Sequence, residues 1–224
     1  MKVKVKICGV RTLEDARAVL EAGADAIGLN FVPDSPRYVP SLKEAQVIAQ
    51  FALSNGLLPV GVFADHSPGE VVERICAVKL RVVQVHGSES AAWGREIRKM
   101  LAAGSGAAPD APKLWKAYRI ATAADLSQIG TEAWPCDALL LDARAEGGVL
   151  GGTGQVFDWS LLDGVARKKE WVLAGGLNPA NVAQAIRRIR PDWVDTASGV
   201  ESAPGRKDPG KIKSFVEETQ KAFV

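Results

Sequence analysis

The sequence contains few of the residues that build metal centres and disulfide frameworks. Its 224 residues include only three cysteines and two histidines. Cys8, Cys76 and Cys136 form no CxxC pair, and their odd number argues against a disulfide framework, so we expect all three to be reduced. His66 and His86 do not lie near a cysteine or a carboxylate at the spacing of metal ligands. We therefore expect no zinc site and no bound metal.

Long apolar runs and a strong bias of charge are also missing. No run approaches the roughly 18 residues that a membrane span requires. The N-terminus has no continuous apolar core of the signal-peptide type, so we expect a cytoplasmic protein. The net charge is +2, and the basic residues are scattered along the chain. A nucleic-acid binder would gather them into a stripe, so we expect neither nucleic acid nor a membrane as a partner.

The sequence does contain a regular alternation of short β-rich apolar runs with longer helical patterns, which is typical of a parallel sheet. This alternation predicts eight strands, at residues 3–8, 26–31, 58–63, 81–86, 114–118, 138–142, 171–175 and 193–197. Eight such units predict an α/β fold, the (β/α)8 TIM barrel, whose usual length is about 250 residues. A doubly wound open sheet is the alternative. The same rhythm continues on both sides of the linker-like segment 102–112, so we expect residues 1–224 to form one domain.

Capping residues mark several helix starts between these strands. Ser41 precedes a helical pattern and has Glu44 three positions later, at the spacing of a capping box. Asp208 followed by Pro209 predicts the start of the last helix. After the seventh strand, Asn178 is predicted to cap the next helix.

In a barrel, chemistry lies where the strands end and the βα loops begin. In the first strand, alternation places Val5 and Ile7 on one face and Lys6 and Cys8 on the other. The apolar face suits the helix shell, so we expect Lys6 and Cys8 inside the barrel. A neighbouring ammonium would lower the pKa of the Cys8 thiol and let it act as a base. The alternative is that Cys8 is a small core residue.

Carboxylates at strand ends supply the matching acidic groups. A buried Lys6 needs a carboxylate partner, which either Asp142 or Asp195 can provide. Asp142 also ends an unbroken apolar strand, where partial desolvation tends to raise a carboxyl pKa and so suits a general acid. Its alternative role is that of a cap or of an ion-pair partner for Arg144.

Two further side chains stand at strand ends. Arg37, after the second strand, has a planar fork suited to binding a carboxylate. An exposed arginine without a ligand is the alternative. His86, at the end of the fourth strand, either faces the barrel mouth or satisfies a local backbone group.

The turns after the last two strands are rich in small residues. Gly175 and Gly176 follow the seventh strand, and Ser198 and Gly199 follow the eighth. In (β/α)8 barrels these two loops commonly hold a phosphate, so the pair predicts a phosphorylated substrate. Ordinary helix capping and tight turns are the alternative. The long glycine-rich segment 143–159 has the length of a lid over the mouth, although it is equally compatible with a slack loop.

Eight segments that span nearly the whole chain carry a family resemblance: KICGVRT, GLNFVPDSPRYV, VGVFAD, VQVHG, LLLDAR, GGTGQVFDW, VLAGGLNPANV and VDTASGVESAPGRKD. They closely resemble the phosphoribosylanthranilate isomerases of tryptophan biosynthesis, and KICG and SPRYV are the most specific elements. The resemblance implies a (β/α)8 barrel that converts N-(5-phosphoribosyl)anthranilate into 1-(2-carboxyphenylamino)-1-deoxyribulose 5-phosphate. This Amadori rearrangement requires no metal and no redox cofactor.

The resemblance also implies roles for the strand-end residues. Asp142 would protonate the furanose ring oxygen, and Cys8, as thiolate, would take the proton from sugar C2. Arg37 would bind the anthranilate carboxylate, and we assign His86 and Asp195 to the substrate site as binding or supporting residues. The phosphate would be held by backbone amides around Gly175, Gly176, Ser198 and Gly199. The expected partner is this small-molecule substrate, and the expected assembly is a monomer or a homodimer.

The sequence departs from the family pattern in two places, and neither removes a proton carrier. VFAD stands where many relatives have VFVN, and VDTASGVE replaces the more usual VDVSSGVE, so Thr196 and Ala197 bear on which amides hold the phosphate. A catalytically silent binding barrel should have lost Cys8 or Asp142. A metal-dependent epimerase should show a cluster of His and Asp. An aldolase-like or synthase relative should show a Lys and a Glu at strand ends. A dual-substrate isomerase should have an aspartate in place of Cys8.

Overall fold

A computed structural model describes residues 2–105, 111–131, 134–143 and 158–222. Eight parallel strands form a closed barrel in chain order, in which β8 pairs back onto β1. The strands are β1 (Lys4–Cys8), β2 (Ala26–Asn30), β3 (Leu58–Phe63), β4 (Val82–Val85), β5 (Lys113–Ile120), β6 (Ala138–Ala143), β7 (Glu170–Leu173) and β8 (Trp193–Thr196). The predicted (β/α)8 barrel is confirmed, and the open-sheet alternative is wrong.

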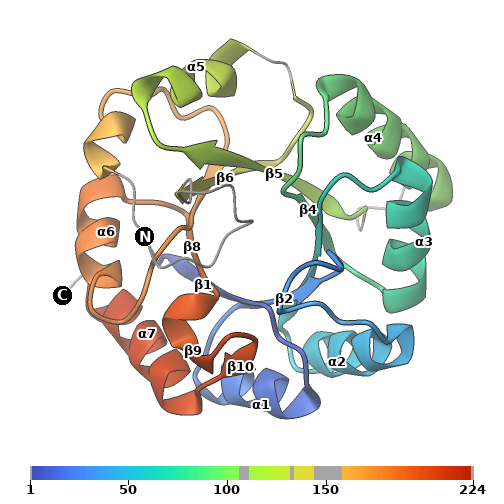
Figure 1. Cartoon of the computed structure of the whole chain (residues 1–224), viewed down its shortest axis with the longest axis horizontal. Coiled ribbons are helices and arrows are strands. Elements are labelled where there is room, and N and C mark those ends of the chain that lie inside the picture. The colour runs from blue at the N-terminus through green and yellow to red at the C-terminus, as the bar shows by residue number, and fades with distance from the viewer. Residues whose placement is uncertain (1, 106–110, 132–133, 144–157, 223–224) are drawn as a thin grey trace.

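The helices form an outer ring around the strands (Figure 1). They are α1 (Leu13–Glu21), α2 (Leu42–Ser54), α3 (Pro68–Val78), α4 (Ala91–Ser105), α5 (Ala123–Thr131), α6 (Val182–Ile189) and α7 (Pro209–Lys221). Between β6 and β7, the described residues include a short 3-10 helix, Trp159–Leu162. Within the described ranges, no helix is long and apolar enough to cross a membrane.

Two of the predicted helix caps are confirmed. The Ser41 hydroxyl accepts a hydrogen bond from the backbone N–H of Glu44 at 3.2 Å. The Asp208 carboxylate accepts one from the N–H of Lys211 at 3.0 Å, with Pro209 at the first helical position of α7. Each side chain satisfies a backbone donor that the first helical turn leaves unpaired.

The predicted cap at Asn178 is wrong. Its Oδ1 accepts from the N–H of Ala180, only two residues further on, at 2.9 Å. This short bond closes a turn in place of a helix start. The helix α6 therefore begins later, at Val182, after the N-cap residue Asn181.

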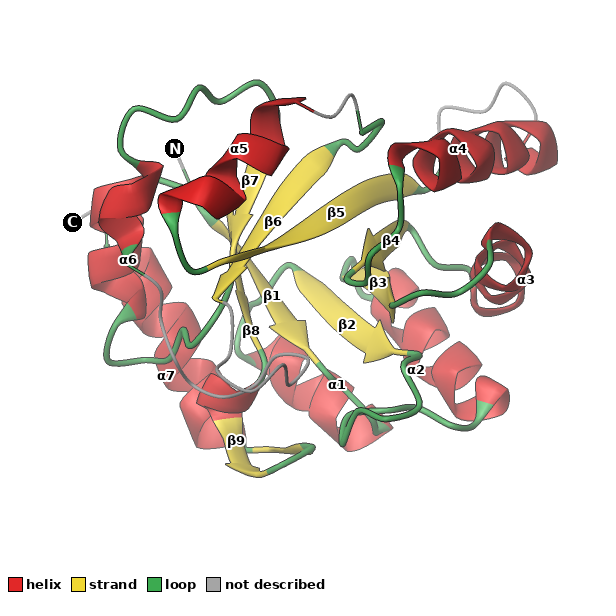
Figure 2. Cartoon of the chain, turned by 45° about the horizontal axis from the view of Figure 1, so that its top comes forward, coloured by secondary structure: helices red, strands yellow, loops and turns green. Residues whose placement is uncertain are grey.

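Strand alternation divides the barrel as the first strand predicts. Val5 and Ile7 belong to the apolar layer between strands and helices, whereas Lys6 is fully buried inside the barrel. Toward the N-terminal ends of the strands, the barrel interior is a separate apolar cluster. In it the rings of Trp115 and Trp193 meet edge to face, with their centroids 5.2 Å apart. Because this apolar cluster fills the N-terminal part of the barrel, the polar interior side chains lie toward the C-terminal ends of the strands, which Figure 2 shows as arrowheads.

A small hairpin extends the loop after β8. A 3-10 helix, Ser198–Val200, leads into β9 (Glu201–Ala203), which pairs antiparallel with β10 (Arg206–Lys207). Glu201 and Lys207 are both buried. The hairpin thereby brings one acidic and one basic side chain to the barrel mouth.

Candidate active site

The predicted site residues come together at the C-terminal ends of the strands. One pocket of about 90 Å³ is lined by Cys8, Arg37, His86, Asp142, Gly175, Gly176, Asp195 and Ser198. Only Gly199, among the predicted site residues, is absent from this lining. On the shorter path around the barrel, β7 and β8 separate Cys8 on β1 from Asp142 on β6. The thiol and the carboxyl therefore approach one pocket from different sides.

Lys6 and Asp195 form a buried ion pair beneath Cys8. The distance between Lys6 Nζ and Asp195 Oδ1 is 2.9 Å, and the lysine side chain is fully buried. Of the two partners considered for Lys6, the structure selects Asp195. Burial opposes the charge on Lys6, but the Asp195 carboxylate and Cys8 outweigh it and raise the pKa of the ammonium. Lys6 thus stays a cation inside the barrel.

Gly28 on β2 makes room for this pair and for the thiol. A Cβ at Gly28 would lie 2.9 Å from Cys8 Sγ and 3.2 Å from Lys6 Cε. A side chain there would push the thiol or the lysine out of place.

The predicted net lowering of the Cys8 pKa is wrong, although Lys6 does act in the predicted direction. Burial raises the pKa of the Cys8 thiol, and the opposing influence of Lys6 and Lys207 does not overcome it. Cys136 shows the same balance, because burial raises its pKa although Lys169 Nζ lies 3.4 Å from its sulfur. A neighbouring lysine therefore does not distinguish Cys8 from an ordinary buried cysteine. Its position in the pocket does.

Asp142 is paired with His86 across the mouth. The distance between His86 Nε2 and Asp142 Oδ2 is 3.0 Å, and the side chains are 18% and 10% exposed. On the other side of the ring, His86 Nδ1 lies 3.4 Å from Gln84 Nε2. His86 thus faces the mouth, as one of its two predicted orientations requires. The alternative partner of Asp142, Arg144, lies outside the described residues.

Arg37 is buried at the mouth, so the exposed alternative is wrong. Its Nε and Nη2 donate to the two carboxylate oxygens of Glu201, both at 2.8 Å. Lys207 Nζ donates to the same carboxylate at 2.8 Å. Burial opposes the charge on Glu201, but Arg37 and Lys207 outweigh it and lower the pKa of the carboxyl. The network fixes the guanidinium beside the pocket, and within the described part of the chain Nη1 and the second N–H of Nη2 have no hydrogen-bond partner.

The small residues after β7 and β8 have specific steric reasons. Gly175 has φ +83°, and a Cβ there would collide with the backbone nitrogen of Ala143 and lie 2.9 Å from Asp142 Oδ1. Only glycine combines this backbone conformation with such a close approach. Gly199 packs against the carbonyl oxygen of Leu177, where a Cβ would also collide. Gly199 therefore supports the turn and does not line the pocket.

Thr196, one of the departures from the family pattern, takes part in this packing. Its hydroxyl donates to the Leu177 carbonyl at 2.7 Å, and its side chain is buried. The substitution thus ties the loop after β8 to the loop after β7.

Sequence reasoning missed several polar residues of this region, among them Asn30 and Ser35, which line the pocket. Gln84 lines the pocket and is 1% exposed, although it lies within the apolar strand β4. Its signal was its position, two residues before His86 on the same strand face. Glu201 and Lys207 lie within the matched segment VDTASGVESAPGRKD, but no local pattern indicated that they meet Arg37. Residues 144–157 of the predicted lid lie outside the described part of the chain.

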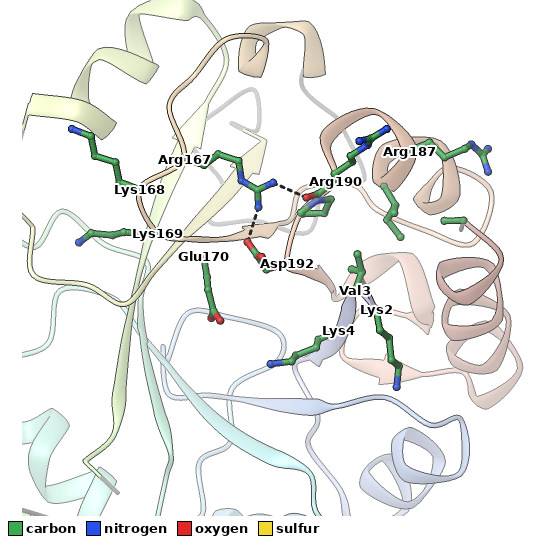
Figure 3. Close-up of a pocket in the computed structure, with 13 residues that line it drawn as sticks. Lys2, Val3, Lys4, Arg167, Lys168, Lys169, Glu170, Arg187, Arg190 and Asp192 are labelled. Atoms are coloured by element: carbon green, nitrogen blue, oxygen red, sulfur yellow. Dashed lines mark hydrogen bonds and ion pairs between the residues drawn. The ribbon is translucent and has the colours of Figure 1, made fainter. Parts of the chain in front are cut away.

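A much larger cavity lies at the opposite end of the barrel. Its volume is about 1130 Å³, and Figure 3 shows its lining of basic side chains around the start of β1 and the end of α6. Here Arg167 donates to the backbone carbonyl of Arg190 at 2.7 Å and pairs with Asp192 at 2.6 Å. None of the predicted site residues lines this cavity.

The chain matches the family model of N-(5'-phosphoribosyl)anthranilate (PRA) isomerase over residues 5–218. The N-(5'-phosphoribosyl)anthranilate isomerase of Magnetococcus marinus is 43% identical over 232 residues, which cover 99% of this chain and 97% of the relative. The protein of the same name from Myxococcus xanthus is 43% identical over 221 residues, with 96% and 95% coverage.

Solved structures agree with these relatives. Phosphoribosyl anthranilate isomerase from Thermotoga maritima is similar with a TM-score of 0.83 and 37% identity, covering 98% of this chain and 99% of that one. A phosphoribosyl anthranilate isomerase in complex with reduced 1-(o-carboxyphenylamino)-1-deoxyribulose 5-phosphate gives a TM-score of 0.79 at 35% identity, with the same coverage. The chain therefore belongs to the N-(5'-phosphoribosyl)anthranilate isomerase family.

Proposed function

We propose that Asp142 and Cys8 are the acid and the base with which this isomerase of tryptophan biosynthesis converts N-(5'-phosphoribosyl)anthranilate into 1-(2-carboxyphenylamino)-1-deoxyribulose 5-phosphate. The single observation that carries the assignment is that both groups line one pocket at the barrel mouth, from strands β1 and β6. An acid and a base on different sides of one sugar can act on its ring oxygen and on its C2 hydrogen without exchanging places.

The protons balance over the reaction. Asp142 gives a proton to the ring oxygen, the bond from that oxygen to C1 breaks, and the amine nitrogen supplies the electron pair of the resulting protonated Schiff base. Cys8, as thiolate, takes the proton from C2, and the electrons of that C–H bond form the enolamine. Conversion to the ketone adds a proton at C1 and releases the enol proton. Aldose becomes ketose with no net gain or loss of protons.

Burial of Cys8 fits the role of a strong base. Its raised pKa makes the thiolate the minor form near neutral pH, but base strength rises with pKa, so that minor form takes a carbon-bound proton more readily. Lys6 and Lys207 both favour the thiolate electrostatically. Asp195 holds Lys6 in place at 2.9 Å and so supports the base without touching the reacting atoms.

Arg37 is proposed to bind the anthranilate carboxylate. It lines the pocket, and Glu201 holds it by two hydrogen bonds of 2.8 Å. A guanidinium fixed in this way loses little freedom when a ligand binds to its unused N–H groups.

The phosphate is proposed to lie against the loops after β7 and β8. Gly175, Gly176 and Ser198 line the pocket there, while Gly199 keeps the second loop close to the first. Backbone amides of such loops are the usual phosphate ligands of (β/α)8 barrels. The related enzyme bound to a reduced ribulose 5-phosphate compound supports a phosphorylated ligand for this chain.

We further propose that residues 1–224 act as one domain in the cytoplasm, as a monomer or a homodimer, with no metal or redox cofactor and no nucleic-acid partner. The family model covers residues 5–218 as one continuous match. A relative from Thermotoga maritima is dimeric. None of the steps above calls for electron transfer or for a Lewis acid, since a carboxylic acid opens the ring, a thiolate takes the C2 proton, and the enolamine becomes the ketone by proton shifts alone.

Turnover of the purified protein, with and without chelator, tests this assignment. Cys8→Ala and Asp142→Asn should each lower kcat by about 10²- to 10⁴-fold and leave KM within a few fold. Cys136→Ala is the matched control, because Cys136 is also buried beside a lysine but lies outside the pocket. Full turnover in either site variant would remove that residue from the mechanism, and loss of activity with chelator would contradict the metal-free reaction.

A further inference from the structure

Gln84, His86 and Asp142 form a line of three polar side chains that leads into the pocket. Gln84 Nε2 lies 3.4 Å from His86 Nδ1, and His86 Nε2 lies 3.0 Å from Asp142 Oδ2. The Gln84 side chain is almost completely buried, and within the described residues its Oε1 has no hydrogen-bond partner. A buried acceptor without a donor is costly, so its presence beside the acid calls for a reason.

The observed contacts define one protonation state of the line. Gln84 Nε2 can only donate, so His86 Nδ1 accepts and the neutral ring carries its proton on Nε2. That Nε2–H donates to Asp142, which is then the ionised carboxylate. In this state Asp142 cannot donate the proton that the ring oxygen needs.

A half-turn of the Gln84 amide converts the line to the opposite state. Oε1 would then face Nδ1 and accept a hydrogen bond from it, so Nδ1 could carry the proton while Nε2 accepts from a protonated Asp142. The unpartnered Oε1 is the atom that this second state requires. The His86 side chain is 18% exposed, so a solvent proton can reach the ring.

We propose that His86, with Gln84 as its switchable partner, reloads the acid Asp142 with a proton from solvent. In the loading step, one proton from water or a buffer acid binds at Nδ1, the proton on Nε2 moves to Asp142 Oδ2, and the carboxylate becomes neutral. Asp142 then donates that proton to the substrate. His86 acts through Asp142 and is a positioning residue. The inference rests on the proposed role of Asp142. It gives His86 a role in proton transfer to Asp142 in place of the direct contact with substrate that the sequence suggested.

Among the described residues, Asp142 is the only ionisable hydrogen-bond partner of the His86 ring. The other charged groups nearby are bound elsewhere. From β5, Arg119 Nη2 donates to the His86 backbone carbonyl at 2.8 Å. From the loop after β3, Asp65 is occupied by the N–H and hydroxyl of Ser88, both at 2.8 Å. Lys6 and Asp195 neutralise each other beneath the pocket.

The kinetic test uses His86→Gln, which keeps a donor for Asp142 but cannot relay a proton. Its kcat should fall at least about tenfold at nearly unchanged KM, and imidazole buffer should restore part of the loss in proportion to its concentration. A purely structural role would not respond to buffer. Gln84→Met, which fills the same space without hydrogen bonds, should cause a smaller, buffer-dependent loss. His66→Gln is the matched control, because His66 is the only other histidine and lies outside the pocket.

A spectroscopic test does not depend on turnover. With ¹⁵N-labelled histidine, the ring nitrogens of only two residues are observed, and His66→Gln assigns them. The free enzyme should show His86 protonated on Nε2, and Gln84→Met should leave both tautomers populated. Wild-type kcat without buffer dependence in His86→Gln, or tautomers unchanged by Gln84→Met, would overturn the inference. If Asp142→Asn is inactive in that case, the proposed function survives; if Asp142→Asn turns over normally, both fail.

Discussion

The two ends of this barrel hold charge in opposite ways. At the mouth, a pocket of about 90 Å³ is surrounded by paired groups: Lys6 with Asp195, Arg37 and Lys207 with Glu201, and His86 with Asp142. At the other end, a cavity of about 1130 Å³ is lined by seven basic and two acidic residues. The whole chain has 26 acidic and 28 basic residues, so the part outside this cavity has three more acidic than basic residues.

The proposed acid and base line the smaller of these two hollows, so volume alone does not predict where they lie. Charges can enter the barrel only with partners, because an unpaired buried charge is strongly unfavourable. The pairs at the mouth also orient one another, which is what an acid and a base require. In the basic cavity the head groups of Lys168 and Arg187 are exposed and have no hydrogen bond or ion pair with any described residue. Solvent screens such charges, and nothing fixes them in one geometry.

The largest expected difference between the two ends is in stability. Lys6→Met should lower the free energy of unfolding by about 3–5 kcal/mol, because it leaves Asp195 as an uncompensated buried charge. Lys4→Met, two residues earlier on the same strand face but exposed at the other end, should change it by less than about 1 kcal/mol. Denaturant unfolding of both variants measures this. Equal losses of unfolding free energy in the two variants would show that the buried Lys6–Asp195 pair contributes no more to stability than the exposed Lys4.

The next largest effect is on substrate affinity. Arg37→Ala should raise KM about 10- to 100-fold with a smaller change in kcat, because it removes a charged hydrogen bond to the anthranilate carboxylate. Arg187→Ala, in the basic cavity, should leave KM unchanged. Steady-state kinetics of the two variants decides the point, and an unaltered KM for Arg37→Ala would end the carboxylate assignment.

A third prediction concerns the pH dependence of Cys8 itself. Burial raises the pKa of this thiol, and the thiolate is the form that reacts with iodoacetamide. Its alkylation rate, followed by mass spectrometry of the Cys8 peptide, should therefore rise about tenfold per pH unit from pH 7 to pH 9. A plateau below pH 8 would mean that the free enzyme already holds a thiolate, and the stated direction of the pKa would be wrong.

The smallest effect is expected from removing charge at the basic cavity. The double variant Lys168→Ala, Arg187→Ala should keep kcat and KM within about twofold of wild type, because exposed and unpaired charges contribute little to geometry or stability. A clear loss of turnover would show that this end of the barrel takes part in the reaction.

The fold followed from the sequence because its signals are local and repeated. Both ends of each predicted strand lie within two residues of the ends of an observed strand. The reason is that β-rich runs, and helix caps such as Ser41 and Asp208, mark each element separately. The cap at Asn178 failed because the same side chain can close a turn or start a helix, and the two are distinguished only by where its oxygen bonds.

The candidate site was partly predictable for the same reason. Strand alternation placed Lys6 and Cys8 inside the barrel, and strand ends located Asp142 and His86. The choice of Asp195 over Asp142 as the partner of Lys6 depends on the closure of β8 onto β1, which no local pattern shows. The pKa of Cys8 depends on how completely it is buried, and that balance between desolvation and attraction requires the assembled barrel.

The central claim is a division of labour between Asp142, which opens the sugar ring, and Cys8, which takes the C2 proton. Rapid quenching with borohydride tests it most directly, because borohydride reduces and traps the open-chain Schiff base. Cys8→Ala should still open the ring and yield the trapped adduct, whereas Asp142→Asn should yield none. Trapped adduct in Asp142→Asn, or none in Cys8→Ala, would contradict the account.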